Sequence, residues 1–473
     1  MEEERMEQIH ALMFPWLAQG HIGPFFQLSK RLAHHGLKVT FLSTPRNITK
    51  IRPLLLHENG KIDLVQLPLP AVEGLLAGAE STSDVPNEME ALLKTALDAL
   101  EQPFEDLLHR LLPDYVVYDF SQYWAATVAA KFGIPAIFFL TFNAASCSYL
   151  LHPSRDMEEK TTVEDLIVPP PAYPSTRVVW RPFEARYIVG ALKDNNGQIS
   201  VMQRFFKSVH GCSFIIIRSC LEMEDKFIQY LEKVIGKAVV PVGLLLPDLP
   251  QKRISEQESL CLRWLDKHPD SSVVYVSFES ECFLSKEHID ALALGLEATG
   301  LPFLWVLRFP RFSKEGCSAS SLLPEGFESR TGDRGLVYSE WAPQLQILAH
   351  PSVGLFLSHS GWSSVVEAVK FGVKLVLVPM NVDQGLNARL VGGELKLGLE
   401  LEREEDGSFT EDQIRTAVLK VMKEECEEVI TVKSRMSEMR ESIFGDSGLE
   451  EKYIREFIKR LKVSKPPNQS GGQ

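Results

Sequence analysis

Short apolar runs alternate with helical patterns along the amino-terminal half of the chain. The apolar runs are typical of buried strands and cover residues 9–14, 38–43, 114–120 and 136–140, whereas helical spacing covers residues 24–35 and 123–132. Gly36 and Gly133 follow the two helical patterns, where glycine commonly ends a helix. This order of strand, helix and strand predicts a parallel sheet with helices on both faces.

The carboxy-terminal half repeats this layout. Its expected strands cover residues 273–278, 303–307, 336–338, 354–357 and 375–378, and its expected helices cover residues 286–299 and 363–371. Residues 411–461 are charged and helical in pattern, and residues 465–473 have the composition of a frayed tail. The pattern therefore predicts an α/β protein with two doubly wound domains and a cleft.

The chain is expected to divide near residue 247. Its 473 residues exceed what a single hydrophobic core holds, about 250 to 300 residues. Apolar segments at 213–218 and 238–246 complete the first half, and the proline and charge content of 247–258 is typical of a linker. We expect an N-terminal domain at 1–246, a linker at 247–258, a C-terminal domain at 259–446, and a last helix and tail at 447–473 that return to the N-terminal domain.

The composition is that of a globular protein, with 45% hydrophobic and 24% charged residues. A formal net charge of -13 argues against a broad nucleic-acid surface, which needs clustered lysine and arginine. Residues 1–8 are acidic, unlike a signal peptide, and no apolar run reaches the roughly 18 to 20 residues of a membrane helix. Seven scattered cysteines without CxxC spacing indicate reduced thiols. We expect a cytoplasmic monomer.

The most informative segment covers residues 341–384 and reads WAPQLQILAHPSVGLFLSHSGWSSVVEAVKFGVKLVLVPMNVDQ. Its stretch from His359 through Gly361 to Ser364 lies between an expected strand and an expected helix. Small residues there place backbone N–H groups and hydroxyls at a helix N-terminus, which attracts phosphate. A simple helix cap at Ser363 or Ser364 explains this turn equally well when the turn is taken alone.

Three further features of the segment favour a nucleotide-sugar pocket. Trp341 follows a strand and precedes a proline, where an indole can stack on a base. Glu367 falls in the first turns of the helix, where a carboxylate can accept from ribose hydroxyls. Asp383 and Gln384 follow another strand, and a carboxylate beside an amide suits a polyol ligand. All of these positions would lie at the carboxyl ends of parallel strands, where open α/β sheets bind ligands.

The segment resembles the donor-binding box of plant family-one UDP-glycosyltransferases. The resemblance implies the GT-B fold of two facing Rossmann-like, doubly wound domains with a cleft between them. The resemblance extends over nearly the whole chain. It includes PWLAQGHIGP at residues 15–24, SSVVYVSFESE from residue 271, LPFLWVLR from residue 301 and LPEGFESRTGDRGLV before the box. Membership would imply an enzyme that uses a UDP-sugar as co-substrate, a small-molecule acceptor and no metal, and the box contains no DxD-like carboxylate pair.

The resemblance implies a role for each matching residue. Trp341 would stack on uracil, the backbone of Ala342 would pair with its edge, and Gln344 and Glu367 would bind ribose. The diphosphate would be bound at the turn before the helix and at a second loop, by His359, Gly361, Ser363, Ser364 and Ser280. The transferred sugar would be contacted by Trp362, Asp383, Gln384 and Thr141.

A catalytic pair is predicted in the other domain. His21 follows the first strand and Asp119 ends a later strand of the same sheet, so both can reach one crevice. A lone histidine in a loop is usually only solvated, but the GHxxP and YDF settings of these two residues resemble the family's pattern. An imidazole can take the proton of the attacking hydroxyl, and a carboxylate behind it stabilises the imidazolium. One displacement would invert the anomeric configuration.

The sequence defines the reaction more closely than it defines the donor sugar and the acceptor. Gln384 resembles the glucose-preferring members, although rhamnose- and xylose-using relatives share this ending. STPRNI from residue 43, the stretch from residue 67 to 86, and DFSQYW from residue 119 resemble a branch that often extends sugars on flavonoids or terpenoids. Simple aglycones are acceptors in that branch too. We expect the acceptor to lie near Trp16, Phe120 and Asn143, with the polar, proline-rich loop at 156–181 as part of a binding cap.

Three departures from the family pattern bear on the donor. Glu279, Ser363 and Lys374 stand where relatives often have Gly, Asn and Pro. The shorter Ser363 would weaken one phosphate contact, and Glu279 would repel a diphosphate unless it turned away. Glu279 and Ser363 leave a noncatalytic UDP-sugar-binding protein as the alternative, and the presence of both His21 and Asp119 argues against it. A nicotinamide dehydrogenase is excluded because no GxGxxG follows the first strand.

Overall fold

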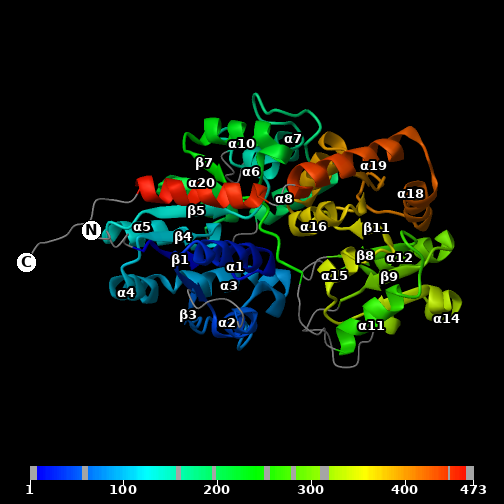
Figure 1. Cartoon of the computed structure of the whole chain (residues 1–473), viewed down its shortest axis with the longest axis horizontal. Coiled ribbons are helices and arrows are strands. Elements are labelled where there is room, and N and C mark those ends of the chain that lie inside the picture. The colour runs from blue at the N-terminus through cyan, green and yellow to red at the C-terminus, as the bar shows by residue number, and fades with distance from the viewer. Residues whose placement is uncertain are drawn as a thin grey trace, which may run out of the picture. The chain divides into compact units, whose positions relative to one another are not determined.

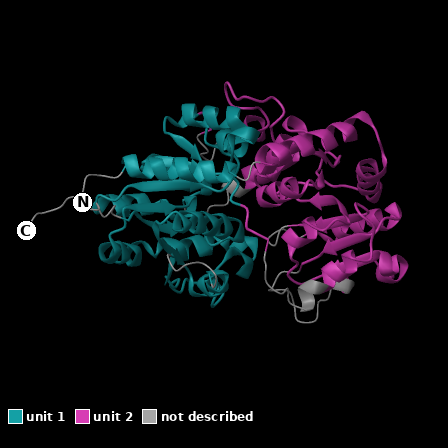
Figure 2. Ribbon diagram, viewed as in Figure 1, with its two compact units in different colours: residues 1–153, 195–245, 447–473 teal, residues 154–194, 246–446 magenta. Residues whose placement is uncertain are grey.

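The computed structural model describes residues 8–55, 62–155, 161–193, 199–249, 256–278, 284–308, 319–445 and 448–464. Its contacts divide the chain into two compact units. Unit 1 comprises residues 1–153, 195–245 and 447–473, and unit 2 comprises residues 154–194 and 246–446 (Figure 2).

Unit 1 is built on a seven-stranded sheet with the order β3-β2-β1-β4-β5-β6-β7 (Figure 1). Each pair of neighbouring strands in it is parallel. The strands are β1 His10–Phe14, β2 Lys38–Ser43, β3 Ile62–Gln66, β4 Tyr115–Tyr118, β5 Ala136–Leu140, β6 Phe214–Ile217 and β7 Val239–Pro241. The direction of strand addition reverses between β1 and β4, so the carboxyl ends of these two neighbours border the sheet's switch point.

Helices cover the sheet of unit 1. They are α1 Gln19–His34, α2 Pro45–Ile51, α3 Glu90–Asp98, α4 Glu101–Leu111, α5 Ala125–Lys131, α6 Ala144–Leu150, α9 Val201–Gly211, α10 Leu221–Ile235 and α20 Leu449–Ser464. Helix α20, red in Figure 1, buries Ile454, Phe457 and Leu461 in the same core as the strands. Its last turn also accepts a hydrogen bond from the Tyr115 hydroxyl of β4 to the Leu461 carbonyl, 2.5 Å long.

Unit 2 is built on a six-stranded sheet with the order β10-β9-β8-β11-β12-β13, and its neighbouring strands are also parallel. The strands are β8 Val273–Ser277, β9 Phe303–Val306, β10 Gly335–Tyr338, β11 Val353–Ser358, β12 Lys374–Leu377 and β13 Gly398–Glu400. Its switch point lies between β8 and β11. The prediction of an α/β protein with two parallel-sheet, Rossmann-like domains is therefore confirmed.

The helices of unit 2 differ more from the predicted pattern than its strands do. They are α7 Val163–Leu166, α8 Pro182–Lys193, α11 Glu256–Leu265, α12 Lys286–Thr299, α13 Ala319–Leu322, α14 Phe327–Thr331, α15 Gln344–Leu348, α16 Trp362–Phe371, α17 Gln384–Ala388, α18 Glu411–Lys423 and α19 Glu427–Arg440. The core contains Leu292 and Leu296 of α12 and Ile414 of α18 on strands β8 and β11. Residues 411–461, expected as helical, contain α18, α19 and most of α20.

Two edge strands have no counterpart in the predicted pattern. The residues of β3 are at most half-buried, and β13 has only three residues. An edge strand buries little apolar surface and so lacks the continuous hydrophobic run of a central strand. The sequence pattern therefore detects the centre of each sheet better than its margins.

Residues 154–194 group with unit 2, although the predicted N-terminal domain includes them. The contacts of this segment explain the assignment. Ser175 donates to Glu394, Trp180 donates to the Val382 carbonyl, and Glu184 pairs with Arg389. These partners lie about 200 positions further along the chain, where periodicity in the sequence gives no information. Part of the expected linker at 247–258 and the whole of the expected tail at 465–473 lie outside the described residues.

Candidate active site

His21 and Asp119 meet at the switch point of unit 1. Asp119 directly follows β4, and His21 lies in the first helical turn after β1, the strand paired with β4. The distance from His21 Nδ1 to Asp119 Oδ2 is 2.8 Å, although the residues are 98 positions apart. Neighbouring parallel strands that end at one edge bring these side chains together.

His21 is helical, whereas the sequence pattern placed it in a loop before a helix starting at residue 24. Helix α1 begins at Gln19 and includes Pro24. The amides of His21 and Ile22 both donate to the Ala18 carbonyl, so the first turn is formed before the proline is reached. Pro24 lacks the amide that would bond one turn back, but it leaves the preceding bonds intact. Placing the helix start at the proline was therefore wrong.

Asp119 is surrounded by donors. Its Oδ2 accepts from the Trp16 amide at 3.1 Å as well as from His21, and its Oδ1 accepts from the Phe120 amide at 2.8 Å. Three donors around a side chain that is 1% exposed fix its orientation. A proton on His21 Nδ1 then bonds the carboxylate, which leaves Nε2 as the nitrogen that can accept a proton.

Thr141 also reaches the His21 ring. Its Oγ1 lies 3.0 Å from His21 Nδ1, the same nitrogen that bonds Asp119. Thr141 follows β5 and is buried. The structure thus brings a residue predicted to contact the sugar into direct contact with the predicted catalytic pair.

The three predicted acceptor residues have different surroundings. Phe120 lies against His21 with ring centroids 5.6 Å apart, and Trp16 packs on Phe120 at 6.2 Å. Asn143 is fully buried, and its side chain caps α6 by accepting from the Ser146 amide. Its contacts therefore support the loop after Thr141.

Phe142 and Phe205 are aromatic neighbours of this site that the sequence analysis did not select. Phe142 lies edge-on to His21 with ring centroids 5.2 Å apart, and Phe205 stacks on Phe120 at 4.5 Å. Phe142 follows Thr141 directly, so its position after a strand was the available signal. Phe205 belongs to α9, and no feature of the sequence connects that helix with His21.

In unit 2 the predicted donor box forms a strand, turn and helix. Strand β11 ends at Ser358, and α16 begins at Trp362 with Gly361 as its N-cap residue. Ser363 is half-buried in the first turn, while Ser364 and Trp362 are buried. The N-terminal turn of α16 and the helix dipole make this position suitable for an anion such as a diphosphate.

His359 and Gly361 are in tight contact within this turn. A Cβ atom built on Gly361 would lie 2.3 Å from His359 Nε2, so only glycine fits beside the imidazole. Ser360 between them has a φ of 69°, in the left-handed region that non-glycine residues seldom adopt. Burial lowers the pKa of His359 to about 4, against an opposing hydrogen bond with the backbone of Ser277. The ring is therefore neutral at physiological pH.

The predicted ribose and uracil residues form a connected group. Gln344 Nε2 donates to Glu367 Oε2 at 2.7 Å and to Ser364 Oγ at 3.1 Å, and Gln344 Oε1 accepts from the Tyr275 hydroxyl. Ala342 is buried, whereas Trp341 is 58% exposed, with the Arg308 guanidinium 4.4 Å from its ring centroid. A cation stacks on one face of this indole, which suits a residue that presents an aromatic plane to solvent.

Asp383 and Gln384 begin the short helix α17. The side-chain oxygen Oε1 of Gln384 accepts from the backbone amides of Met380 and Asn381, each at 3.0 Å. This side chain therefore closes the loop that leads to it. Asp383 Oδ2 accepts from Asn387 Nδ2 at 2.8 Å, and the same amide donates to the Ser360 carbonyl at 3.0 Å. Asn387 therefore joins the two parts of the predicted donor site, and it lies three residues beyond the segment that the sequence analysis used.

The structure describes the surroundings of Lys374 but not those of Ser280 and Glu279. Ser280, predicted to bind the diphosphate, and Glu279, the charged departure beside it, lie outside the described residues. Lys374 stands at the amino end of β12, and its Nζ donates to the Val421 carbonyl of α18. Because the predicted donor residues lie at the opposite ends of the strands, the Lys374 departure is remote from them.

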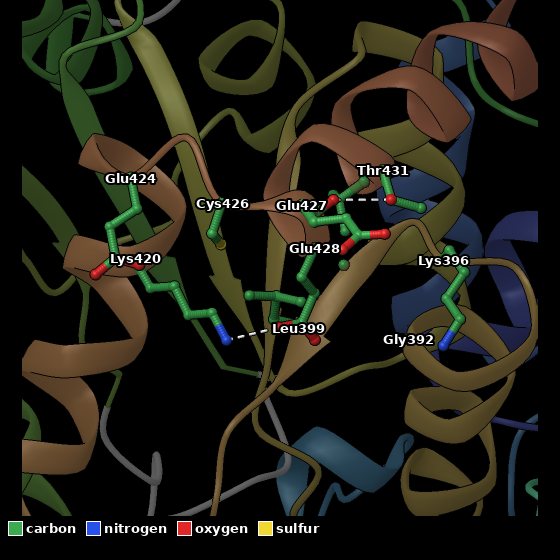
Figure 3. A pocket seen from close by; sticks show the side chains of 11 residues that line it. Gly392, Lys396, Leu399, Lys420, Glu424, Cys426, Glu427, Glu428 and Thr431 are labelled. Atoms are coloured by element: carbon green, nitrogen blue, oxygen red, sulfur yellow. Dashed lines mark hydrogen bonds and ion pairs between the residues drawn. The ribbon is translucent and has the colours of Figure 1, made fainter.

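A cavity of about 490 Å³ lies elsewhere in unit 2, between β13, α18 and α19 (Figure 3). Lys420 and Glu428 form an ion pair of 2.6 Å within its lining. None of the lining residues belongs to the predicted catalytic or donor sets. Among the described residues there is no cluster of three potential metal ligands, and no helix there is long and apolar enough to cross a membrane.

Comparisons with known proteins identify the class. Residues 7–243 match the family model "Glycosyltransferase, N-terminal domain", and residues 260–441 match "UDP-glucoronosyl and UDP-glucosyl transferase". The first match alone covers half of the chain. The chain belongs to the plant family-one UDP-glycosyltransferases, enzymes that transfer a sugar from a UDP-sugar to a small-molecule acceptor.

The relatives agree over almost the full length. UDP-glycosyltransferase 91B1 of Arabidopsis thaliana is 39% identical over 97% of this chain and 98% of its own. The anthocyanidin-3-O-glucoside rhamnosyltransferase of Petunia hybrida is 39% identical over 88% of each chain. A structure of Arabidopsis thaliana UGT89C1 complexed with UDP-L-rhamnose is 27% identical and covers 96% of this chain and 99% of that one, with a TM-score of 0.75. The prediction of an enzyme of this family with a UDP-sugar co-substrate is confirmed.

Proposed function

We propose that this chain transfers glucose from UDP-glucose to a hydroxyl group of a flavonoid or terpenoid, with inversion at the anomeric carbon. The observation that carries the proposal is the hydrogen bond between His21 and Asp119 at the switch point of unit 1. His21 is the general base, and Asp119 holds its ring and stabilises the imidazolium that forms. The acceptor is an aglycone or an existing glycoside.

The reaction needs a base because an alcohol or phenol is a poor nucleophile at neutral pH. His21 Nε2 takes the proton as the hydroxyl oxygen attacks the anomeric carbon and the bond to the diphosphate breaks. The carboxylate of Asp119 accepts from Nδ1 throughout, so positive charge on the ring is matched by a buried negative charge. Thr141 Oγ1, close to the same nitrogen, further restricts rotation of the ring.

The donor is bound by the described residues of the box in unit 2. Amides at the start of α16 and the neutral His359 stabilise the diphosphate as it leaves, and Trp341 stacks on uracil. Gln344 and Glu367, already joined by a hydrogen bond, bind the ribose hydroxyls. Asp383, Gln384 and Trp362 contact the transferred sugar. Ser280 and Thr141 complete the predicted set of donor residues.

UDP-rhamnose is the second candidate donor. The Petunia hybrida relative is named for rhamnosyl transfer to an anthocyanidin 3-O-glucoside, and the Arabidopsis thaliana structure contains UDP-L-rhamnose. The name of the first also supports a glycoside as acceptor. The glutamine at position 384 favours glucose, and UDP-xylose is a third possibility that the same ending allows.

Mass spectrometry of products separates these donors. Purified protein is given UDP-glucose, UDP-rhamnose or UDP-xylose separately, each with flavonoid and terpenoid aglycones and their monoglycosides. A gain of one hexose from UDP-glucose alone supports the proposal, whereas a gain of deoxyhexose would reassign the donor. His21→Ala should lower the transfer rate about 10³-fold while UDP binding is retained, because general-base catalysis contributes about 10² to 10⁴. Unchanged turnover in this variant would remove His21 as the base.

A further inference from the structure

The loop that carries the predicted sugar contacts is held by a segment from the other half of the chain. We call residues 379–384 the sugar loop and residues 175–186 the strap. Both belong to unit 2, although the chain places them about 200 positions apart. We propose that Trp180 of the strap is a positioning residue for the sugar loop and thereby sets how well the enzyme distinguishes a UDP-sugar from UDP. This inference rests on the proposed contact between the sugar loop and the transferred sugar.

The central contact joins the indole of Trp180 to the middle of the loop. Trp180 Nε1 donates to the Val382 carbonyl at 3.2 Å, and the Trp180 side chain is 1% exposed. Val382 by contrast is 51% exposed and has a φ of 44°. A β-branched residue in the left-handed region is strained, and such a conformation persists only where neighbouring groups hold it. The indole hydrogen bond is one of those restraints.

The rest of the strap anchors the elements that follow the loop. Ser175 Oγ donates to Glu394 at 2.5 Å, and Arg177 donates to the Gly393 carbonyl at 3.1 Å. Glu184 pairs with Arg389 at 2.6 Å, and both side chains are about one-tenth exposed. These bonds fix α17 and the turn after it against the strap.

Glu184 also limits what can stand directly after Gln384. A Cβ atom on Gly385 would lie 2.6 Å from the Glu184 carboxylate, so the backbone of α17 approaches the strap as closely as glycine permits. Contacts of this kind restrict movement of the residues that they support. The geometry of a binding site therefore depends on the residues around it. The Trp180 indole therefore restrains the middle of the sugar loop, and the Glu184 carboxylate lies against the residue that follows it.

The start of the sugar loop is held by Arg403. Arg403 donates to the Pro379 carbonyl at 2.5 Å and to the Met380 sulfur, while its guanidinium stacks on Phe183 of the strap. The loop is thus bound at its start by Arg403, at its centre by Trp180 and at its end by Glu184 through Arg389. Arg403 and the strap form one continuous support because the Arg403 guanidinium contacts Phe183 of the strap.

This support acts on the sugar end of the donor. The described residues predicted to bind uracil and ribose lie on other elements, and they are Trp341, Ala342, Gln344 and Glu367. Loosening the sugar loop should therefore weaken binding of UDP-glucose and leave binding of UDP nearly unchanged. A residue that only stabilised the fold would weaken both ligands or neither.

Trp180→Phe tests this selectivity, since it removes the N–H and keeps an aromatic ring. Affinities for UDP and UDP-glucose are measured by calorimetry on the full chain. The ratio of UDP-glucose to UDP affinity should fall about fivefold, as expected for one neutral hydrogen bond, with a matching rise in the KM for UDP-glucose and a smaller change in kcat. Arg403→Lys, which alters the residue that binds the start of the loop, should lower the same ratio.

Trp264→Phe is the matched control. Trp264 Nε1 donates to the Asp333 carbonyl, also at 3.2 Å, in the same unit but away from the sugar loop. It should leave the affinity ratio unchanged whatever its effect on the melting temperature. An equal loss of affinity for UDP and UDP-glucose in Trp180→Phe, or no loss of affinity for either, would overturn the positioning role.

Asp383→Asn separates failure of this inference from failure of the proposed function. If it changes the affinity ratio and Trp180→Phe does not, the sugar loop binds sugar but Trp180 does not position it. If neither variant changes the ratio, the assignment of the sugar loop to the sugar is itself wrong.

Discussion

His21 and His359 occupy related places in the two units and have opposite properties. Each lies after a strand that borders the switch point of a parallel sheet, β1 in unit 1 and β11 in unit 2. Each is nearly buried. His21 bonds a carboxylate, whereas His359 packs against Gly361 and has its pKa lowered to about 4 by burial.

The difference shows that similar positions in two parallel sheets can give a histidine different surroundings. A buried carboxylate favours a ring that accepts and releases a proton, as a base must. Desolvation that outweighs a backbone hydrogen bond lowers the pKa of His359 and keeps its ring neutral. Three substitutions test this contrast, and a fourth tests a buried carboxylate in unit 1.

Asp119→Asn should have the largest effect. It removes the charge that stabilises protonated His21, and the transfer rate should fall about 10²-fold or more in steady-state kinetics, with UDP affinity unchanged. Asp114→Asn is the control, because Asp114 lies at the other end of β4, where it accepts from the His10 amide. Equal losses in the two variants would show that Asp119 acts only in folding.

Gly361→Ala should weaken the donor site without altering the base. The new Cβ must displace His359, so affinity for UDP-glucose should fall about tenfold, which corresponds to about 1.4 kcal/mol. Calorimetry measures the affinity, and the pH dependence of transfer should match that of the unaltered enzyme. Gly190→Ala provides the comparison, since a Cβ there meets nothing within 4 Å. A shifted pH profile in Gly361→Ala would argue against separate roles for the two histidines.

Glu224→Gln should change the pH dependence of stability in unit 1. Glu224 accepts from the amides of Ala144 and Ala145 at the start of α6, and burial raises its pKa to about 7 despite these bonds and one from Ser219. The folded state therefore binds the proton more tightly than the unfolded state, so this group makes stability fall as pH rises from about 4.5 to 7. The limiting slope is about 1.4 kcal/mol per pH unit.

Melting temperatures of the wild-type protein and Glu224→Gln between pH 5 and 8 measure that contribution. The variant should gain stability relative to wild type as the pH rises. Glu232→Gln, on an exposed position of the same helix, should show no such trend. A constant difference between wild type and Glu224→Gln would mean that Glu224 does not titrate in this range.

His359→Gln should show the opposite pH dependence of stability, measured on the protein without ligand. A histidine whose folded pKa lies near 4 binds fewer protons when folded than when unfolded, so its contribution to stability is lost as pH falls from about 6.5 to 4. The variant should therefore lose less stability than wild type on acidification, again by at most about 1.4 kcal/mol per pH unit. His34→Gln on exposed helix surface is the control in the same melting experiment, and an identical acid response in wild type and His359→Gln would mean that His359 protonates freely.

Much of this molecule follows from local patterns. The central strands, such as β2 and β5, are continuous apolar runs, and α12 has both its N-cap and its terminal glycine in the sequence. The donor box is a local segment because a strand, a turn and a helix N-terminus are enough to form an anion site. The candidates His21 and Asp119 were identifiable for the same reason, since each follows a strand of the same predicted sheet.

Other features depended on contacts between distant residues. Periodicity assigned residues 154–194 to the first half, but hydrogen bonds to residues near 390 place them in unit 2. Phe205 reaches Phe120, and Trp180 reaches Val382, because of how whole elements pack. The sequence by itself determined the two parallel sheets, the family and the residue types of both sites. Only the tertiary structure decided that one site histidine has a carboxylate partner and the other is desolvated, because those properties belong to the surroundings that folding creates.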